Sequence, residues 1–162
     1  MRLLIDRLNT QPVPSNEQIE EAVHALLGRD GVVLPDGLIE VKFCSDEDIQ
    51  KINAEFLEET AITDVIAFEL LEVDPETGEL IIGSIAVNHD LAVRNATEHV
   101  QNMKLDDSRL TEYVASEIVL YVLHGILHFA GYDDEFPEDR KEMFDIAAEV
   151  LSRLGHPIIP YE

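Results

Sequence analysis

Two histidines four residues apart, His124 and His128, stand near the end of a long apolar segment. On a helix this spacing puts both side chains on one face, about one turn apart. Gly131 can end that helix, because glycine adopts the left-handed conformation that helix C-termini often need. The turn would return Asp134 toward the histidines. Two imidazoles, one carboxylate and an open fourth position are the ligand set of a catalytic zinc site.

The histidine pair alone is a weak indication of a metal. Six histidines among 162 residues give such a pair by chance in roughly one chain in five, and two hydrogen-bonded core histidines are the ordinary alternative. The full pattern, H-x-x-x-H-x-x-G-x-x-D, is much harder to obtain by accident. We therefore predict one divalent metal ion held by His124, His128 and Asp134, with zinc as the expected ion.

The segment 113–129 is apolar nearly all round, which is typical of a buried helix. Its polar exceptions fall on one stripe of the helix and are Glu117, Tyr121, His124 and His128. Burying these groups is costly unless each has a partner, and a metal is the simplest common one. Glu117 is interpreted as a hydrogen-bond partner of a histidine ring or as a base, the former being the commoner role.

Hydrophobic periodicity and capping residues predict four strands, at 2–8, 38–44, 63–71 and 80–87. The same criteria predict helices at about 15–28, 45–57, 89–103, 108–130 and 137–154. Ser15 with Gln18 forms a capping box, and Ser45 caps the following helix. We predict an α+β fold in a single domain over residues 1–162. A mixed sheet of about four strands packs with about five helices, and the helix that carries the histidines is the buried central element.

The formal net charge of −23 taken alone argues against nucleic acid, because nucleic-acid affinity comes largely from Lys and Arg contacts with phosphate. The single cysteine, Cys44, cannot form an internal disulfide, and the first residues are too briefly apolar for a signal peptide. The run 113–129 is interpreted as too short and too polar to cross a bilayer. These features predict a cytoplasmic protein without a membrane partner.

The metal pattern resembles the extended zinc motif of the metzincin proteases, in which a glycine turn delivers a third ligand six residues after the second histidine. That motif has a glutamate directly after the first histidine, as general base. Here the position is Gly125, which has no side chain to take a proton. Peptide hydrolysis by the usual route is therefore disfavoured.

Residues 124–133, His-Gly-x-Leu-His-x-x-Gly-Tyr-Asp, are more similar to the signature of the YbeY family. Supporting matches are Asn53, the stretch Thr-Asp-Val-Ile-Ala-Phe at 63–68 and Gly-Ser-Ile at 83–85, and the similarity extends over about 38–155. The resemblance implies a single-strand-specific, zinc-dependent endoribonuclease of ribosomal RNA maturation and small-subunit quality control. Its implied partners are ribosomal RNA and the small ribosomal subunit, and not DNA.

The chain departs from the family pattern at four positions. Asp134 replaces the third histidine ligand, Leu57 an arginine thought to matter for catalysis, Ile62 a proline, and Ser84 an aspartate. A carboxylate in place of an imidazole removes positive charge, so we expect the metal to be a weaker Lewis acid. Lys51, on the same predicted helix, is a candidate substitute for the arginine, although such a lysine usually lies at the surface.

These departures leave alternatives open. The chain is either an active endoribonuclease, a weak or inactive ribosome-associated factor that keeps a structural metal, or a protease-like metallohydrolase with another substrate. A set of two histidines and one carboxylate also resembles the non-haem iron oxygenases, although no second feature of the chain indicates a cosubstrate site.

Overall fold

The computed structural model describes residues 1–7, 13–56 and 61–161. Their strands are β1 (Arg2–Arg7), β2 (Leu38–Cys44), β3 (Val65–Val73) and β4 (Leu80–Asn88). Their helices are α1 (Asn16–Leu27), α2 (Asp46–Phe56), α3 (His89–Asn102), α4 (Leu110–Phe129) and α5 (Pro137–Arg153), with a short 3-10 turn, η1 (Asp107–Arg109). The predicted α+β fold, with its order of elements, is confirmed.

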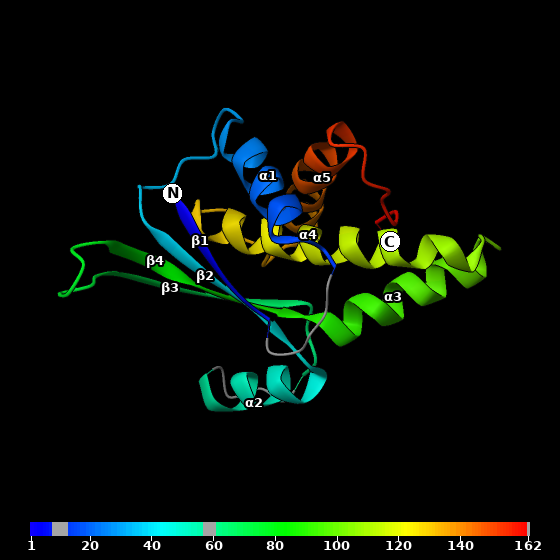
Figure 1. Ribbon diagram of the computed structural model, residues 1–162, viewed down its shortest axis with the longest axis horizontal. Coiled ribbons are helices and arrows are strands. Elements are labelled where there is room, and N and C mark those ends of the chain that lie inside the picture. The colour runs from blue at the N-terminus through cyan, green and yellow to red at the C-terminus, as the bar shows by residue number, and fades with distance from the viewer. Residues whose placement is uncertain (8–12, 57–60, 162) are drawn as a thin grey trace.

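The four strands form one sheet in the order β1-β2-β4-β3. The pairs β1–β2 and β2–β4 are parallel, whereas β3 and β4 form an antiparallel hairpin, so the sheet is mixed as predicted. The β3–β4 register shifts between Glu69 and Glu72, where Leu71 has a φ of 51°. Helices α1, α4 and α5 cover one face of the sheet, α2 lies on the other, and α3 runs beside α4 (Figure 1).

The centre of the core is α4, which packs against α1, α3, α5, β3 and β4. Fourteen of its twenty residues are buried. Together with η1 it spans 23 residues, and by length and composition alone this helix is apolar enough to cross a membrane. The expectation that it is too short and too polar is therefore wrong on those two criteria. Its burial within the fold accounts for its apolar character.

The N-termini of α1 and α2 are closed by the predicted caps. Ser15 accepts a hydrogen bond from the Gln18 backbone, and the Gln18 side chain accepts one from the Ser15 backbone. Ser45 and Asp48 make the same reciprocal pair at α2. Strand β3 begins two residues later than predicted, directly after Asp64, whose side chain accepts the Val65 N–H at 2.8 Å.

Two glycines allow α4 and β3 to approach β4 closely. A Cβ added to Gly125 would lie 2.9 Å from the Cδ1 of Ile85, so the residue after His124 faces the sheet and not the site. A Cβ added to Gly83 would lie 2.2 Å from the backbone oxygen of Phe68 and 2.6 Å from the ring of Phe129. At Gly83 the atom nearest to an added Cβ is a backbone oxygen, which cannot move aside as a side chain can.

We expect Gly83→Ala to lower the free energy of unfolding by about 2 kcal/mol, because the added methyl group overpacks the β3–β4–α4 junction. Gly28→Ala is the control: at that helix end φ is −80° and the nearest atom to an added Cβ is 3.5 Å away. Urea unfolding of both variants checks this, and equal stabilities would contradict the packing argument.

Candidate metal centre

The three predicted ligands converge. The Nε2 of His124 lies 3.2 Å from the Oδ2 of Asp134, and the Nε2 of His128 lies 3.1 Å from that of His124. The remaining pair, His128 Nε2 and Asp134 Oδ2, is 3.4 Å apart. Ligand atoms about 2.0–2.1 Å from a tetrahedral zinc ion stand about 3.3 Å from each other. The three groups therefore can hold one small metal ion.

The turn after α4 delivers Asp134 as the sequence predicted. Gly131 has a φ of +95°, and the Tyr132 N–H donates to the Leu127 carbonyl at 3.0 Å, which reverses the chain. The Tyr132 carbonyl lies 3.2 Å from the Nδ1 of His128. A proton on Nδ1 donates to that carbonyl and leaves Nε2 as a lone-pair donor aimed at the centre.

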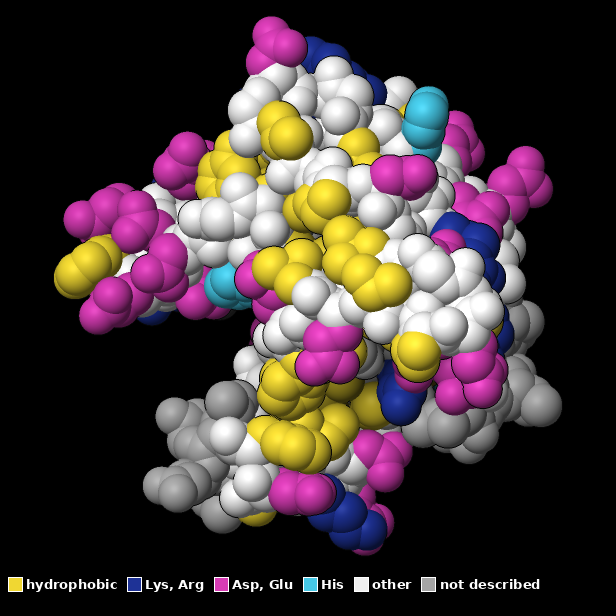
Figure 2. Space-filling model, turned by 90° about the vertical axis from the view of Figure 1, so that its left-hand side faces the viewer, with side chains coloured by type: hydrophobic (Ala, Val, Ile, Leu, Met, Phe, Trp, Pro, Cys, Tyr) yellow, Lys and Arg dark blue, Asp and Glu magenta, His cyan; other side chains and the backbone are white. Residues whose placement is uncertain are grey.

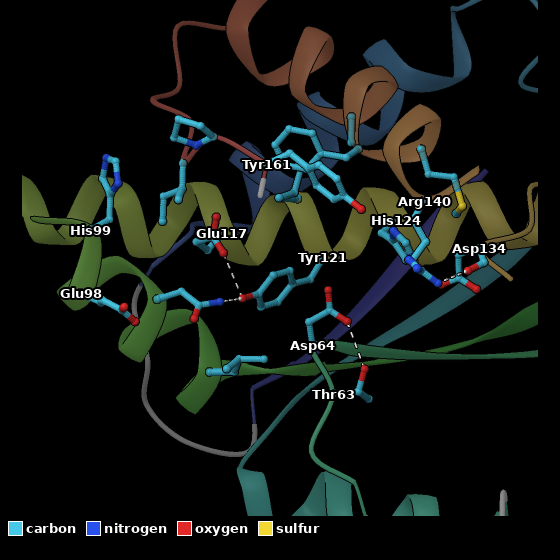
Figure 3. Close-up of a pocket in the computed structure, with 18 of the residues that line it drawn as sticks. Thr63, Asp64, Glu98, His99, Glu117, Tyr121, His124, Asp134, Arg140 and Tyr161 are labelled. Atoms are coloured by element: carbon cyan, nitrogen blue, oxygen red, sulfur yellow. Dashed lines mark hydrogen bonds and ion pairs between the residues drawn. The ribbon is translucent and has the colours of Figure 1, made fainter. Parts of the chain in front are cut away.

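The other half of the polar stripe finds different partners. Glu117 is 6% exposed, and its Oε2 accepts a hydrogen bond from the Tyr121 hydroxyl at 3.0 Å. The Asn95 amide on α3 donates to the Tyr121 oxygen at 3.0 Å (Figure 3). The interpretation of Glu117 as a hydrogen-bond partner of a histidine ring is not supported, because the hydrogen bonds that its carboxylate accepts come from Tyr121 and Asn95.

Burial raises the pKa of Glu117 to about 7, although the hydrogen bonds from Tyr121 and Asn95 act to lower it. The negative charge of Asp64 adds to the increase. Burial, followed by the charge of Glu117, also raises the pKa of Tyr121 well above its ordinary value. A carboxyl group that titrates near neutral pH thus lies inside the same cavity as His124.

Two cavities flank the metal ligands, and Asp134 lines both. The larger, about 640 Å³, extends from His124 along α4 toward α3 and the C-terminal segment. The smaller, about 560 Å³, is lined by His128 and reaches Asn53 on α2. Figure 2 shows the molecule hollowed between the main body and the lobe that α2 forms below it. The ligand cluster therefore lies in a cleft with open space on either side.

Sequence reasoning did not single out Asp64, which lies before β3 and whose carboxylate points into the larger cavity (Figure 3). Its Oδ1 also accepts the Thr63 hydroxyl at 3.2 Å. The available indication was a carboxylate directly before a β-rich run. Buried Asn53 donates to the Ala61 carbonyl at 2.6 Å and holds the cleft wall, while Ile62 lines both cavities.

Two positions of the predicted helix 45–57 concern the family arginine. Leu57 lies outside the described residues, so its place is not assigned. Lys51 is exposed and pairs with Glu47 at 3.1 Å, and it lines neither cavity. Lys51 is therefore a surface lysine, the role expected to be the more common one, and its position does not support the alternative that it replaces the family arginine. Cys44 is buried, and burial raises its pKa to about 11, as expected of a core thiol.

Comparison with known proteins identifies the family. The family model described as Endoribonuclease YbeY matches residues 6–155. The protein of that name from Bacillus licheniformis is 32% identical over 166 residues, which cover 96% of this chain and 97% of that protein. Its Bacillus subtilis counterpart is 30% identical, with 96% and 98% covered. The chain belongs to the endoribonuclease YbeY family, a class of enzymes that cleave RNA.

Two further matches differ in extent. The Rhodopirellula baltica Endoribonuclease YbeY is 34% identical over 124 residues, which cover 75% of this chain and 57% of that protein. A protein from Thermotoga maritima of known solution structure is 22% identical, with 96% of this chain and 92% of that chain covered and a TM-score of 0.54. At that identity the likeness concerns the fold alone.

The raised pKa of Glu117 predicts a pH-dependent stability. Because its pKa rises from 4.5 to about 7 on folding, the unfolded chain releases this proton first as the pH rises. The free energy of unfolding of the metal-free protein should therefore decrease as the pH rises from 4.5 to about 7, and Glu117 should account for about 3 kcal/mol of this decrease.

Glu117→Gln should remove that loss, because the amide does not ionise. Urea unfolding at pH 5 and pH 8 in the presence of a chelator measures the difference. Glu112→Gln, a change at an exposed glutamate of the same helix, should behave as the wild type. Equal pH dependence in all three proteins would show that Glu117 ionises normally.

Proposed function

We propose that the chain is a zinc-dependent endoribonuclease that cleaves single-stranded regions of ribosomal RNA in the cytoplasm, during maturation and quality control of the small ribosomal subunit. Residues 1–162 act in this proposal as a single domain. The observation that carries it is the convergence of His124, His128 and Asp134 in an open cleft of a chain from the YbeY family.

These three residues would hold one zinc ion or another divalent metal. When bound, such an ion acidifies a coordinated water and polarises a phosphoryl oxygen. The protein's own contribution is orientation: the Tyr132 carbonyl fixes the His128 ring, and the Gly131 turn fixes Asp134. Glu117, with a pKa of about 7, can take or release a proton within the same cavity.

The shape and lining of the cleft support a single-stranded substrate. Proteins recognise duplex RNA mainly by its shape and through its phosphates and 2′-hydroxyl groups. Such binding would require an exposed basic surface, which is unexpected in a chain of net charge −23. Unpaired bases can instead enter a cavity and stack on aromatic rings. Tyr121, Phe144 and Tyr161 line the larger cavity, and the rings of Phe144 and Tyr161 stand 5.1 Å apart.

A second function is favoured by two observations. The high negative charge and the pairing of Lys51 with Glu47 fit a ribosome-associated factor that keeps a structural metal and cleaves little. A protease-like hydrolase is less well supported, because the residue after His124 packs on Ile85, and a glutamate there would meet that side chain.

We expect the purified protein to carry about one zinc ion per chain and to cleave single-stranded ribosomal RNA fragments. His124→Ala and Asp134→Asn should lose both properties, because each removes one of three ligands. Asp133→Asn is the matched control, since this neighbouring exposed carboxylate accepts a local backbone hydrogen bond from Glu135 and lines neither cavity.

Metal analysis and a gel-based cleavage assay on the same preparations decide between the functions. Zinc without cleavage would favour the structural factor. Absence of both zinc and cleavage in the wild type would remove both proposals.

A further inference from the structure

Of the Asp, Glu, Lys and Arg side chains that line the two cavities, all but one are acidic. Among the described residues, Arg140 is the only lysine or arginine that lines either cavity. The carboxylates that line them are Asp64, Glu69, Glu98, Glu117 and Asp134. A phosphodiester entering such a cleft is repelled unless a cation meets it near the point of reaction.

Arg140 is held beside the metal ligands by the loop that carries one of them. It lies in the first turn of α5, and its Nη1 donates to the Asp134 carbonyl at 3.1 Å and to the Glu135 carbonyl at 3.4 Å. Figure 3 shows the guanidinium beside Asp134, at the edge of the larger cavity. The backbone of the third ligand thus fixes the position of this cation.

The charge of Arg140 is not neutralised by an ion pair. No carboxylate oxygen of the described residues lies within the 4.0 Å of a salt bridge, although the chain has 34 acidic side chains. Arginines that do pair with carboxylates include Arg2, Arg29, Arg94, Arg109 and Arg153. A guanidinium carries five N–H donors, and only Nη1 of Arg140 is engaged in a bond to the described residues.

The charges of the site leave a need for such a group. A divalent ion together with the Asp134 carboxylate has a net charge of about +1, whereas a phosphodiester under attack develops a second negative charge. One guanidinium raises the positive charge of the site to about +2, which balances the two negative charges of the phosphodiester under attack. Its planar pair of N–H groups can donate to two phosphoryl oxygens.

We propose that Arg140 binds the non-bridging oxygens of the scissile phosphodiester, so that it is a catalytic residue of this chain. The inference rests on the proposed function and names the cation that the reaction uses. It assigns to α5 the role for which Lys51 on α2 is unsuitably placed.

RNA binding tests the proposal without relying on turnover. The affinity of the zinc-loaded protein for a 2′-O-methylated single-stranded RNA is measured by fluorescence anisotropy over a range of salt concentrations. Arg140→Gln removes the positive charge, so the slope of log K against log salt should become shallower by about 0.7. Arg140→Lys should keep the slope.

Lys141→Gln is the matched control, because Lys141 pairs with Asp145 at 2.8 Å and lines neither cavity. Its slope should equal that of the wild type. On cleavable RNA, Arg140→Gln should lower kcat about a hundredfold with the zinc content unchanged, and Arg140→Lys should recover part of the rate.

The outcomes separate the two proposals. If the wild type binds zinc but does not cleave, the endoribonuclease proposal and the catalytic role of Arg140 both fail, and the difference in slope then decides only whether Arg140 contacts an RNA phosphate. An unchanged slope in Arg140→Gln overturns the inference. Loss of zinc in Arg140→Gln with the slope unchanged would show that Arg140 only braces the Asp134 loop.

Discussion

The burial of α4 is the constraint on which the rest of the molecule depends. A helix enclosed on most sides can carry polar side chains only where each one meets a partner. Glu117 meets Tyr121, and the two histidines meet Asp134 across the reversing turn. Gly125, on the sheet side, lets the helix settle against β4. One packing requirement thus produces the core on one face and a converging donor set on the other.

The charged side chains of the cleft determine its protonation and its ability to accept a phosphate group. Asp64 and Glu117 enter the larger cavity from different elements, and their repulsion, added to burial, keeps the Glu117 carboxyl protonated to higher pH. Asp134 adds negative charge at the metal ligands, and Arg140 is tied to the same loop by its hydrogen bonds. The acidic character that argues against RNA over the whole surface is offset at one point within the cleft.

Interactions between residues close together in the sequence were sufficient to predict most of the fold. The caps at Ser15 and Ser45, and the glycine turn that brings Asp134 back, act over three to six residues, so the sequence alone reveals them. Contacts between distant segments were not predictable in this way. Asp64, directly before β3, and Arg140 on α5 reach the site only because the sheet and helices assemble. The partners assigned to the polar stripe were incomplete because Asn95, the outer member of the hydrogen-bonded group, belongs to another helix.

The outer half of the β3–β4 hairpin affects the tendency of the protein to self-associate. Strand β3 is an edge of the sheet, and its exposed Leu70, Leu71 and Val73 are side chains that favour strand addition. The positive φ of Leu71 breaks the ladder there, and Glu69 and Glu72 place carboxylates along the same edge. A second molecule approaching in register would meet like charges and a bent backbone, which discourages fibril-like growth from this side.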